Sequence, residues 1–197
     1  MLGGENLEKQ LDQMNGKELG KLFPIIISEH NPMWHALYLS EKSKIENSIG
    51  LKSIIRINHF GSTSVCNLRA KPTIDILLEI HTDMDTEQII SLLKGIGYNY
   101  SPQPNNPAPH MMFMKGYTLN GFSGQAYHLH VRYSGDWDEL YFRDYLILYP
   151  EIAEEYGDLK LQLKEKYEFD REGYTNAKSC FINGSTEQAR KEFGKRY

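Results

Sequence analysis

The sequence predicts a mixed α/β fold in a single domain, and three observations carry that prediction. Residues 53–60 and 72–80 are short, isoleucine-rich or leucine-rich runs of strand length. Residues 111–119 and 124–133 read as two further strands that form a hairpin. From residue 136 onward the apolar residues are spaced as in helices. No repeated unit is visible, so we expect one α/β domain rather than a repeat protein.

Length and composition bound the class of protein. A chain of 197 residues suits one ordinary domain, and its 40% apolar and 24% charged residues are near globular norms. The net charge of −4 provides no basic field for a nucleic-acid backbone, which disfavours a nucleic-acid partner. No run approaches the ~20 apolar residues of a membrane helix, and the first ten residues lack the apolar core of a signal peptide. We therefore expect a cytoplasmic protein without a membrane partner.

The two cysteines point to the same compartment. Cys66 and Cys180 stand apart, without the CxxC spacing of a thiolate metal site or the number that a disulfide framework needs. This usage favours a reducing compartment. The sequence says nothing about the oligomeric state.

The helices and turns follow in order along the chain. Residues 1–22 predict an N-terminal helical appendage, because leucines at loosely helical spacing occur in a polar segment. Residues 32–50 predict the first long helix, with Asn31 as its cap and Pro32 at its first position. Residues 86–96 predict an amphipathic helix, stopped by Gly97.

The remaining elements depend on turn residues. Tyr98 and Tyr100 start a short strand, and the proline-rich segment 101–110 can only be a loop. Asn120-Gly121 is a hairpin signal between two runs with strand character. Three helical segments then complete the chain.

The stretch between the first two strands is a candidate phosphate site. Gly61, Ser62 and Thr63 form a small-residue turn that we expect to lead into a short helix, whose free backbone N–H groups favour an anion. Such turns also cap helices throughout proteins, so the pattern alone is weak.

Asp75 is the most informative residue of the following strand. Aspartate disfavours strand interiors and resists burial unless it is paired or binds a metal, so Asp75 needs a partner. Lys71, at the start of the strand, is one candidate for a structural salt bridge.

His128 and His130 offer a second partner. They alternate with Leu129 and Val131, so both imidazoles point to one face of a strand. With Asp75 they have the composition of a two-histidine, one-carboxylate site for iron, zinc or manganese. The alternative is one half-buried structural histidine and one surface histidine.

The run HFGSTSVCNLRAKPTIDILLEI and the later HLHV strand resemble the GrpB-like family. Matching positions extend in order over roughly residues 24 to 183, which is far more specific than any single motif. Besides the residues already named, they include the following: Leu68, Ala70, Pro72, Phe142, Arg143, Asp144, Tyr145, Leu146, Tyr156, Lys160, Tyr174 and Lys178. The sequence departs from the family at Ser64-Val65-Cys66-Asn67, where Ala-Val-Pro-Gly is more common.

The resemblance implies a nucleotidyltransferase-like fold over residues 23–197, with a small mixed sheet flanked by helices. It further implies transfer of a nucleoside monophosphate, or a related phosphate-bearing group, from a nucleoside triphosphate to an acceptor, using a divalent metal such as magnesium, manganese or zinc. Asp75, Lys71 and Arg143 would be catalytic, and Asp75, His128 and His130 would hold the metal. Gly61, Ser62, Thr63, Lys160 and Lys178 would bind the phosphate.

One departure keeps the alternatives open. Such transferases place two acids two residues apart on this strand, whereas position 77 is leucine here. Either the histidines rebuild the metal site, or the cleft only binds a nucleotide or phosphometabolite. A third reading is a histidine-carboxylate metal centre with hydrolytic or oxidative chemistry.

Overall fold

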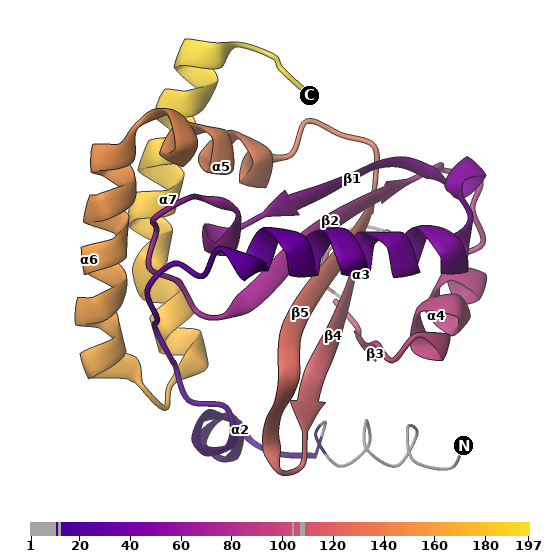
Figure 1. The fold of residues 1–197 in the computed structure, drawn as a ribbon, viewed down its shortest axis with the longest axis horizontal. Helices are drawn as coiled ribbons and strands as arrows, with labels where there is room; N and C mark the ends of the chain where they lie inside the picture. Colours follow the sequence, from indigo (N-terminus) through magenta and orange to yellow (C-terminus); the bar gives the residue numbers. More distant parts are fainter. Residues whose placement is uncertain (1–10, 12, 104, 107–108) are drawn as a thin grey trace.

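A computed structural model describes residues 11, 13–103, 105–106 and 109–197, in which a group of strands and helices is followed by three consecutive C-terminal helices (Figure 1). The strands are β1 (Ile54–Phe60), β2 (Thr73–Ile80), β3 (Asn99–Ser101), β4 (Met111–Thr118) and β5 (Gly121–Tyr133). The helices are α2 (Gly16–Leu22), α3 (Met33–Ile49), α4 (Thr86–Gly95), α5 (Asp138–Leu148), α6 (Pro150–Tyr167) and α7 (Arg171–Phe193). Two short 3₁₀ helices, η1 (Leu51–Ser53) and η2 (Ser62–Ser64), flank β1. The predicted mixed α/β fold is confirmed.

The described strands form one mixed sheet in the order β1-β2-β5-β4-β3. β2 is antiparallel to β1 and parallel to β5, and β5 is antiparallel to β4. Asp75 on β2 lies opposite His128 on β5, and Leu77 lies opposite His130. This register brings together side chains that are more than fifty positions apart in the sequence.

The two faces of the sheet differ in chemistry because side chains alternate along each strand. On one face, residues such as Ile76, Leu78 and Leu129 pack in an apolar cluster with side chains of α3 and α4. We call this the apolar face. The other, polar face carries Asp75 and His128, and α5 to α7 form the helical layer beyond it (Figure 1). The expected cover on both sides of β2 is therefore present.

Three local predictions need correction. The expected helix after Gly61 is a single 3₁₀ turn, η2, so it supplies no α-helix dipole. The hairpin turn is Leu119-Asn120, and Gly121 is the first residue of β5, with a positive φ of 94°. The N-cap of α3 is Pro32 rather than Asn31, although the Asn31 side chain accepts a hydrogen bond from the Met33 N–H.

β1 is an edge strand whose backbone is partly covered by side chains. Tyr38 on α3 donates its hydroxyl to the Ile57 carbonyl, at 3.2 Å. Arg143 on α5 donates Nη1 to the His59 carbonyl, at 3.0 Å. Arg143 is held in turn by Asp144 and by the Tyr197 hydroxyl. These bonds occupy carbonyl groups that an exposed edge would leave free.

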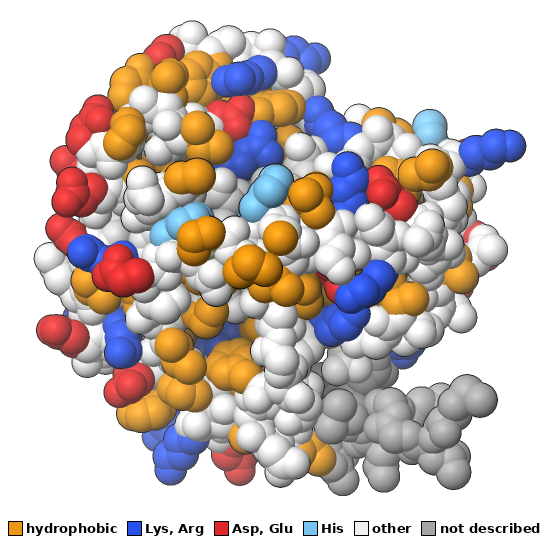
Figure 2. Space-filling model, viewed as in Figure 1, with side chains coloured by type: hydrophobic (Ala, Val, Ile, Leu, Met, Phe, Trp, Pro, Cys, Tyr) orange, Lys and Arg blue, Asp and Glu red, His pale blue; other side chains and the backbone are white. Residues whose placement is uncertain are grey.

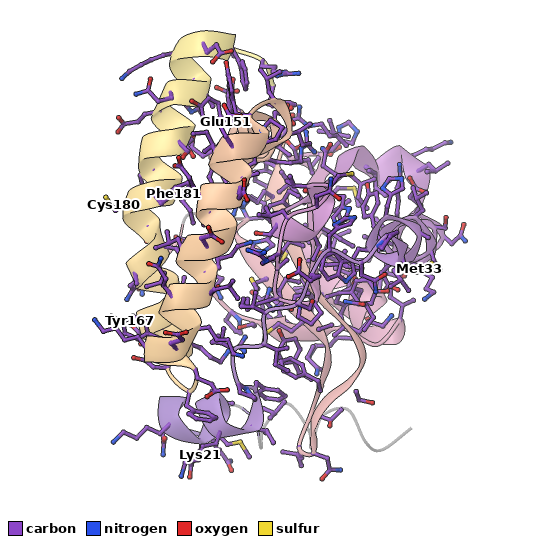
Figure 3. All side chains as sticks on the ribbon, turned by 60° about the vertical axis from the view of Figure 1, so that its left-hand side comes forward. Lys21, Met33, Glu151, Tyr167, Cys180 and Phe181 are labelled. Atoms are coloured by element: carbon purple, nitrogen blue, oxygen red, sulfur yellow. The ribbon has the colours of Figure 1, made fainter. Side chains whose placement is uncertain are left out.

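The helical layer is held together by aromatic packing between α6 and α7. These helices run side by side, and Phe181 of α7 stacks on Tyr156 of α6 with ring centroids 5.1 Å apart (Figure 3). Cys180, which immediately precedes Phe181 in α7, points away from the helical layer and is exposed. At the other end, α2 approaches the α6–α7 connection so closely that a Cβ on Gly20 would overlap the Phe169 carbonyl. The rest of the predicted appendage, residues 1–10 and 12, lies outside the described residues.

Charge is unevenly distributed over the helical layer. Exposed acidic side chains of α6 include Glu151, Glu155 and Asp158, and acidic side chains gather along the left edge of the molecule, on the side where α6 lies (Figure 1 and Figure 2). Lys160 lies on the opposite, buried side of the same helix. Within the described part of the chain, no helix is both long enough and apolar enough to span a bilayer.

Candidate functional site

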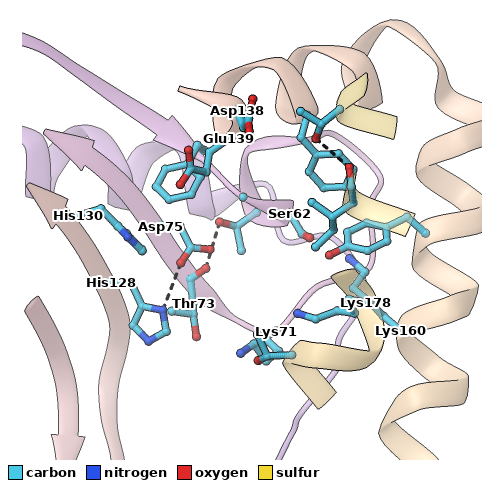
Figure 4. A pocket seen from close by; sticks show the side chains of 18 of the residues that line it. Ser62, Lys71, Thr73, Asp75, His128, His130, Asp138, Glu139, Lys160 and Lys178 are labelled. Carbon is cyan, nitrogen blue, oxygen red and sulfur yellow. Dashed lines mark hydrogen bonds and ion pairs between the residues drawn. The ribbon is translucent and has the colours of Figure 1, made fainter. Parts of the chain in front are cut away.

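A cavity of about 870 Å³ lies between the polar face of the sheet and the helical layer. Its walls come from the turn after β1, from β2 and β5, and from α5, α6 and α7. The lining residues with polar or charged side chains include Ser62, Thr63, Lys71, Thr73, Asp75, His128, His130, Asp138, Glu139, Tyr156, Lys160, Arg171, Tyr174 and Lys178 (Figure 4). All the residues predicted from the sequence to hold a phosphate therefore border one space.

Gly61 brings the turn against the carboxylate of Asp75. Its φ of 69° lies in the left-handed region that favours glycine. A Cβ at this position would lie only 2.3 Å from Asp75 Oδ2. The positive φ and the close approach to Asp75 therefore both require glycine at position 61. The close approach also shows that the turn and the carboxylate lie at the same corner of the cavity.

Asp75 is paired with a histidine rather than with Lys71. His128 Nδ1 lies 3.2 Å from Asp75 Oδ1, and His128 Nε2 lies 2.7 Å from the Tyr117 hydroxyl. Burial alone would raise the pKa of Asp75, but the hydrogen bond from His128 and the charges nearby hold that pKa below its ordinary value. Burial lowers the pKa of His128, against the opposing effect of Asp75. The pair is thus a carboxylate and a neutral imidazole.

Cationic side chains gather on the helical side of the cavity. Burial, reinforced by Lys178 and Arg171 and opposed by Asp75, lowers the pKa of Lys71 to about 8. Burial also lowers the pKa of Lys178 to about 8, and that of Lys160 to about 6. Within the described residues none of these three lysines forms a salt bridge with a carboxylate. We call Lys71, Lys160 and Lys178 the lysine cluster; at pH 7 Lys71 and Lys178 carry its positive charge, because a pKa of about 6 leaves Lys160 mostly neutral.

Two aromatic residues of the helical layer support the lysine cluster. The ammonium groups of Lys178 and Lys71 lie 4.4 Å and 5.8 Å from the centroid of the Tyr174 ring. Lys160 lies 4.6 Å from the Tyr156 ring and donates a hydrogen bond to the Arg69 carbonyl. The hydroxyl of Tyr174 is buried without a hydrogen-bond partner among the described residues. Such an unsatisfied group is uncommon in a folded protein and is often associated with function.

Two other predicted residues have evident structural roles. Thr63 is buried, and its hydroxyl donates to the Thr73 carbonyl at 3.2 Å and contacts His59 Nε2 at 3.0 Å. Arg143 is not among the residues that line the cavity, because its guanidinium bonds to the His59 carbonyl, to Asp144 and to Tyr197. Its contacts fasten α5 to the edge of the sheet.

The residues present do not fit a preassembled metal centre. Both nitrogens of His128 are already engaged, by Asp75 and by Tyr117. Leu77, where a second acid would stand, is fully buried in an apolar cluster with Phe60 and Leu140. Across the described ranges, no three histidine, cysteine or acidic side chains are arranged to hold one ion. The paired-carboxylate site of a two-metal transferase is therefore not formed.

His130 borders the cavity without joining the Asp75 pair. Its ring lies edge-on to Phe60, with centroids 5.1 Å apart. Burial lowers the pKa of His130 to about 4, so the imidazole is neutral at pH 7. It contributes polarity but no charge.

The structure adds two residues that the sequence did not single out. Tyr117 on β4 binds the back of His128, and Arg171 lines the cavity and donates to the Phe23 carbonyl at 3.0 Å. Nothing in the local sequence marks either one, since a tyrosine in a strand and an arginine at a helix start are ordinary. The antiparallel pairing of β4 with β5 sets Tyr117 beside His128, and the return of α7 brings Arg171 to the cavity.

Fold and cavity together define a mixed α/β protein whose cavity combines a glycine turn, the carboxylate of Asp75 beside that turn and a lysine cluster. The family model for the GrpB protein matches residues 24–188, and the chain belongs to that family. The resemblance seen in the sequence is thereby confirmed.

Curated relatives agree with this assignment. The glutamate-rich protein GrpB of Alkalihalophilus pseudofirmus is 36% identical over 163 residues, which cover 81% of this chain and 92% of that protein. A UPF0157 protein of Pseudomonas aeruginosa is 36% identical over 75% of this chain. The matched region spans 60% of that protein, and 46% of the UPF0157 protein YqkA of Bacillus subtilis.

Solved structures give the same result for the fold. The crystal structure of the conserved protein GrpB from Enterococcus faecalis matches with a TM-score of 0.74 and 27% identity, over 85% of this chain and 99% of that one. A structure of the Cid1 poly(U) polymerase matches with a TM-score of 0.49 and 12% identity, over 71% of this chain and 44% of that one. The second similarity is too low to support an argument about function.

Proposed function

We propose that the cavity binds a phosphate-bearing small molecule, either a nucleotide or a phosphometabolite. The observation that carries this proposal is the lysine cluster, in which Lys160 is buried, Lys71 and Lys178 are half-buried and repel one another, and no member forms a salt bridge with a carboxylate among the described residues. Buried charges are costly unless paired, so an arrangement of this kind favours an anionic ligand. The exposed side of α6 is acidic, whereas its cavity side carries Lys160. The lysines of the cluster therefore line the cavity and not the exposed side of α6.

The turn and α7 would contact the phosphate from opposite sides. The first N–H groups of η2 have no partner within that helix and can donate to an anion, as can the Ser62 hydroxyl. Lys71 and Lys178 would supply the countercharge, and the unpartnered Tyr174 hydroxyl would supply a further donor. This supports a small ligand rather than a nucleic-acid backbone.

Nucleotidyl transfer is a second candidate, favoured by the closeness of Asp75 to the turn. In such a reaction an acceptor attacks the α-phosphate of a nucleoside triphosphate, and pyrophosphate leaves. Asp75 is the carboxylate nearest the proposed phosphate position, so Asp75→Asn should abolish pyrophosphate release. Among the residues that the structure describes, no preformed site holds the divalent ion expected from the family resemblance, and the proposed phosphate binding does not depend on it.

The proposal is tested by the thermal unfolding of the protein with a panel of phosphates. The panel is inorganic phosphate, ribose 5-phosphate, AMP and ATP, each in EDTA and with magnesium, manganese or zinc. A ligand that binds only the folded state at about 100 times its Kd stabilises by about 2.7 kcal/mol, which raises the melting temperature by several degrees. We expect at least one phosphate to raise it in EDTA.

Matched variants locate the binding. Lys178→Met should remove the ligand-induced shift, and Ser62→Tyr should block it sterically. Lys191→Met changes an exposed lysine on the same helix and should leave the shift unchanged. No shift with any phosphate, or an equal shift in Lys178→Met, would refute the proposal.

A further inference from the structure

Asp75 presents a problem for an anion site. Its side chain is 25% exposed and borders the cavity, while Oδ1 is engaged by His128. Oδ2 forms no hydrogen bond with any of the residues described and faces Gly61. An ionised carboxylate repels a phosphate placed on the adjoining turn. A proton donor or a cation must therefore lie between Oδ2 and the ligand's phosphate.

A cation at this point is poorly supported by the surroundings. Leu77 removes the second carboxylate, and His128 cannot turn a free nitrogen toward a metal without breaking a hydrogen bond. The phosphate would already be neutralised by Lys71, Lys178 and Arg171. What Oδ2 lacks is one hydrogen-bond donor.

We propose that Asp75 Oδ2 accepts a hydrogen bond from a hydroxyl group of the ligand, so that the cavity selects hydroxyl-bearing phosphate esters such as sugar phosphates and nucleotides. This inference rests on the proposed function and narrows its ligand class. A hydroxyl satisfies the carboxylate without adding charge, and it fits the single unpaired acceptor at the corner beside the turn.

Tyr117 and His128 are positioning residues for this contact. An ionised carboxylate only accepts hydrogen bonds, so His128 Nδ1 must carry the proton that points at Oδ1. Nε2 of the neutral ring then accepts from the Tyr117 hydroxyl, at 2.7 Å. Because Tyr117 occupies Nε2, the ring cannot flip its tautomer or its orientation without losing a buried hydrogen bond. The free oxygen of Asp75 is thereby directed toward the turn.

The test compares two ligands that differ only in hydroxyl groups. Calorimetric titrations in EDTA measure the Kd of AMP and of 2′,3′-dideoxy-AMP for the wild-type protein, with inorganic phosphate as a reference. A site that hydrogen-bonds a hydroxyl through a charged group should bind AMP at least about tenfold more tightly. Ribose 5-phosphate shows whether the base matters.

Variants then assign the preference to Asp75. In Asp75→Asn, the amide oxygen would face the His128 Nδ1–H, and the amide NH₂ would stand in the position of Oδ2. A neutral amide donor would replace the charged acceptor, so the hydroxyl would have to accept a weaker hydrogen bond instead of donating one, and the preference for AMP should fall severalfold.

Tyr117→Phe keeps the ring and removes the hydroxyl, so the preference should fall severalfold. Tyr127→Phe is the matched control, because Tyr127 is equally buried, at 5% exposure, on the adjacent strand but faces the apolar side. Its preference should equal that of the wild type.

A spectroscopic signature separates positioning from mere stability. The imidazole ¹⁵N shifts of His128 should show a protonated Nδ1 and an unprotonated Nε2, and Tyr117→Phe should move the Nε2 shift. The opposite tautomer would overturn the inference even if every variant folds well.

Other outcomes are equally decisive. Equal affinity of the wild type for AMP and its dideoxy analogue overturns the inference, as does binding that requires a divalent metal. If inorganic phosphate or ribose 5-phosphate still binds, the proposed function survives that failure. If no phosphate binds in any condition, the proposed function itself fails.

Discussion

Lys115 and the lysine cluster lie on opposite sides of the same sheet and differ in their partners, because Lys115 is paired with a carboxylate and the lysine cluster is not, within the described residues. On the apolar face, Lys115 Nζ donates to the fully buried Glu41 at 2.7 Å and to the Ile96 carbonyl at 2.9 Å. On the polar face, Lys71 and Lys178 lie against the Tyr174 ring, and neither forms a salt bridge with a carboxylate in the described part of the chain. The same residue type is satisfied where it is structural and left unsatisfied where a cavity opens. The difference identifies the cavity as the place where an external anion is expected.

The largest loss of stability should come from breaking the Lys115–Glu41 ion pair on the apolar face. Glu41→Gln leaves the Lys115 ammonium facing a neutral amide in a buried setting, which should lower the free energy of unfolding by about 3 kcal/mol. Urea unfolding measures the change. Glu46→Gln, in the partly exposed Lys42–Glu46 pair of the same helix, is the control and should cost well under about 1 kcal/mol.

A double variant tests whether the loss of stability comes from the unpaired charge of Lys115. Glu41→Leu combined with Lys115→Met removes both charges and should recover most of the lost stability, since apolar replacements of buried ion pairs are often neutral. If Glu41→Gln costs no more than its control, the contrast between the two faces loses its basis.

The pH dependence of the free energy of unfolding should reveal the lowered pKa values of the lysines in the cavity. Lys71 and Lys178 have pKa values of about 8 in the folded protein, below the ordinary lysine value of roughly 10.4 in the unfolded chain. Between these values the unfolded chain binds more protons, so the free energy of unfolding rises with pH. We expect a gain of about 2 kcal/mol from about pH 8 to about pH 9.5, measured by urea unfolding.

The source of that gain can be isolated. In the double variant Lys71→Met, Lys178→Met the rise should become shallower and keep only the part that Lys160 contributes, and a saturating phosphate ligand should also reduce it by keeping Lys71 and Lys178 protonated. A wild-type stability that falls over this range would contradict the lowered pKa values of the two lysines.

The smallest expected effect has the opposite sign to the first. Lys178→Met removes one repulsive charge from the cavity while keeping an apolar chain against Tyr174, so the ligand-free protein should gain about 1 kcal/mol at pH 7. Urea unfolding compares it with Lys191→Met on the same helix, which should change stability little. A loss of stability in Lys178→Met would mean that its contact with the Tyr174 ring outweighs the repulsion.

Most of the fold follows from local sequence patterns. Apolar runs predicted β1 and β2, the Asn120-Gly121 signal between two runs of strand character predicted the β4–β5 hairpin, and Gly97 marked the end of the α4 region. The errors are in short segments, where backbone geometry is decided by a few bonds. The turn at Gly61 closes after three residues because Ser64 and Val65 donate to Gly61 and Ser62 carbonyls, and this cannot be read from residue types.

The site was harder to predict because its contacts are non-local. Alternation placed His128 and His130 on one face, but only the register of β2 against β5 sets Asp75 beside His128. His128, which the sequence predicted as a metal ligand, is instead hydrogen-bonded to Asp75 and to Tyr117. Arg143 matched the family pattern without any indication that its guanidinium bonds to a backbone carbonyl of β1.

The bonds along β1 bear on how copies of the chain behave toward one another. A sheet margin with free carbonyls is a template for adding strands from another molecule, and here Tyr38 and Arg143 cover two of those carbonyls. Arg143 is in turn anchored by Tyr197. Asp144 holds the same guanidinium from its other side, so two anchors keep Arg143 over the β1 margin and leave fewer free carbonyl groups for a strand of another molecule.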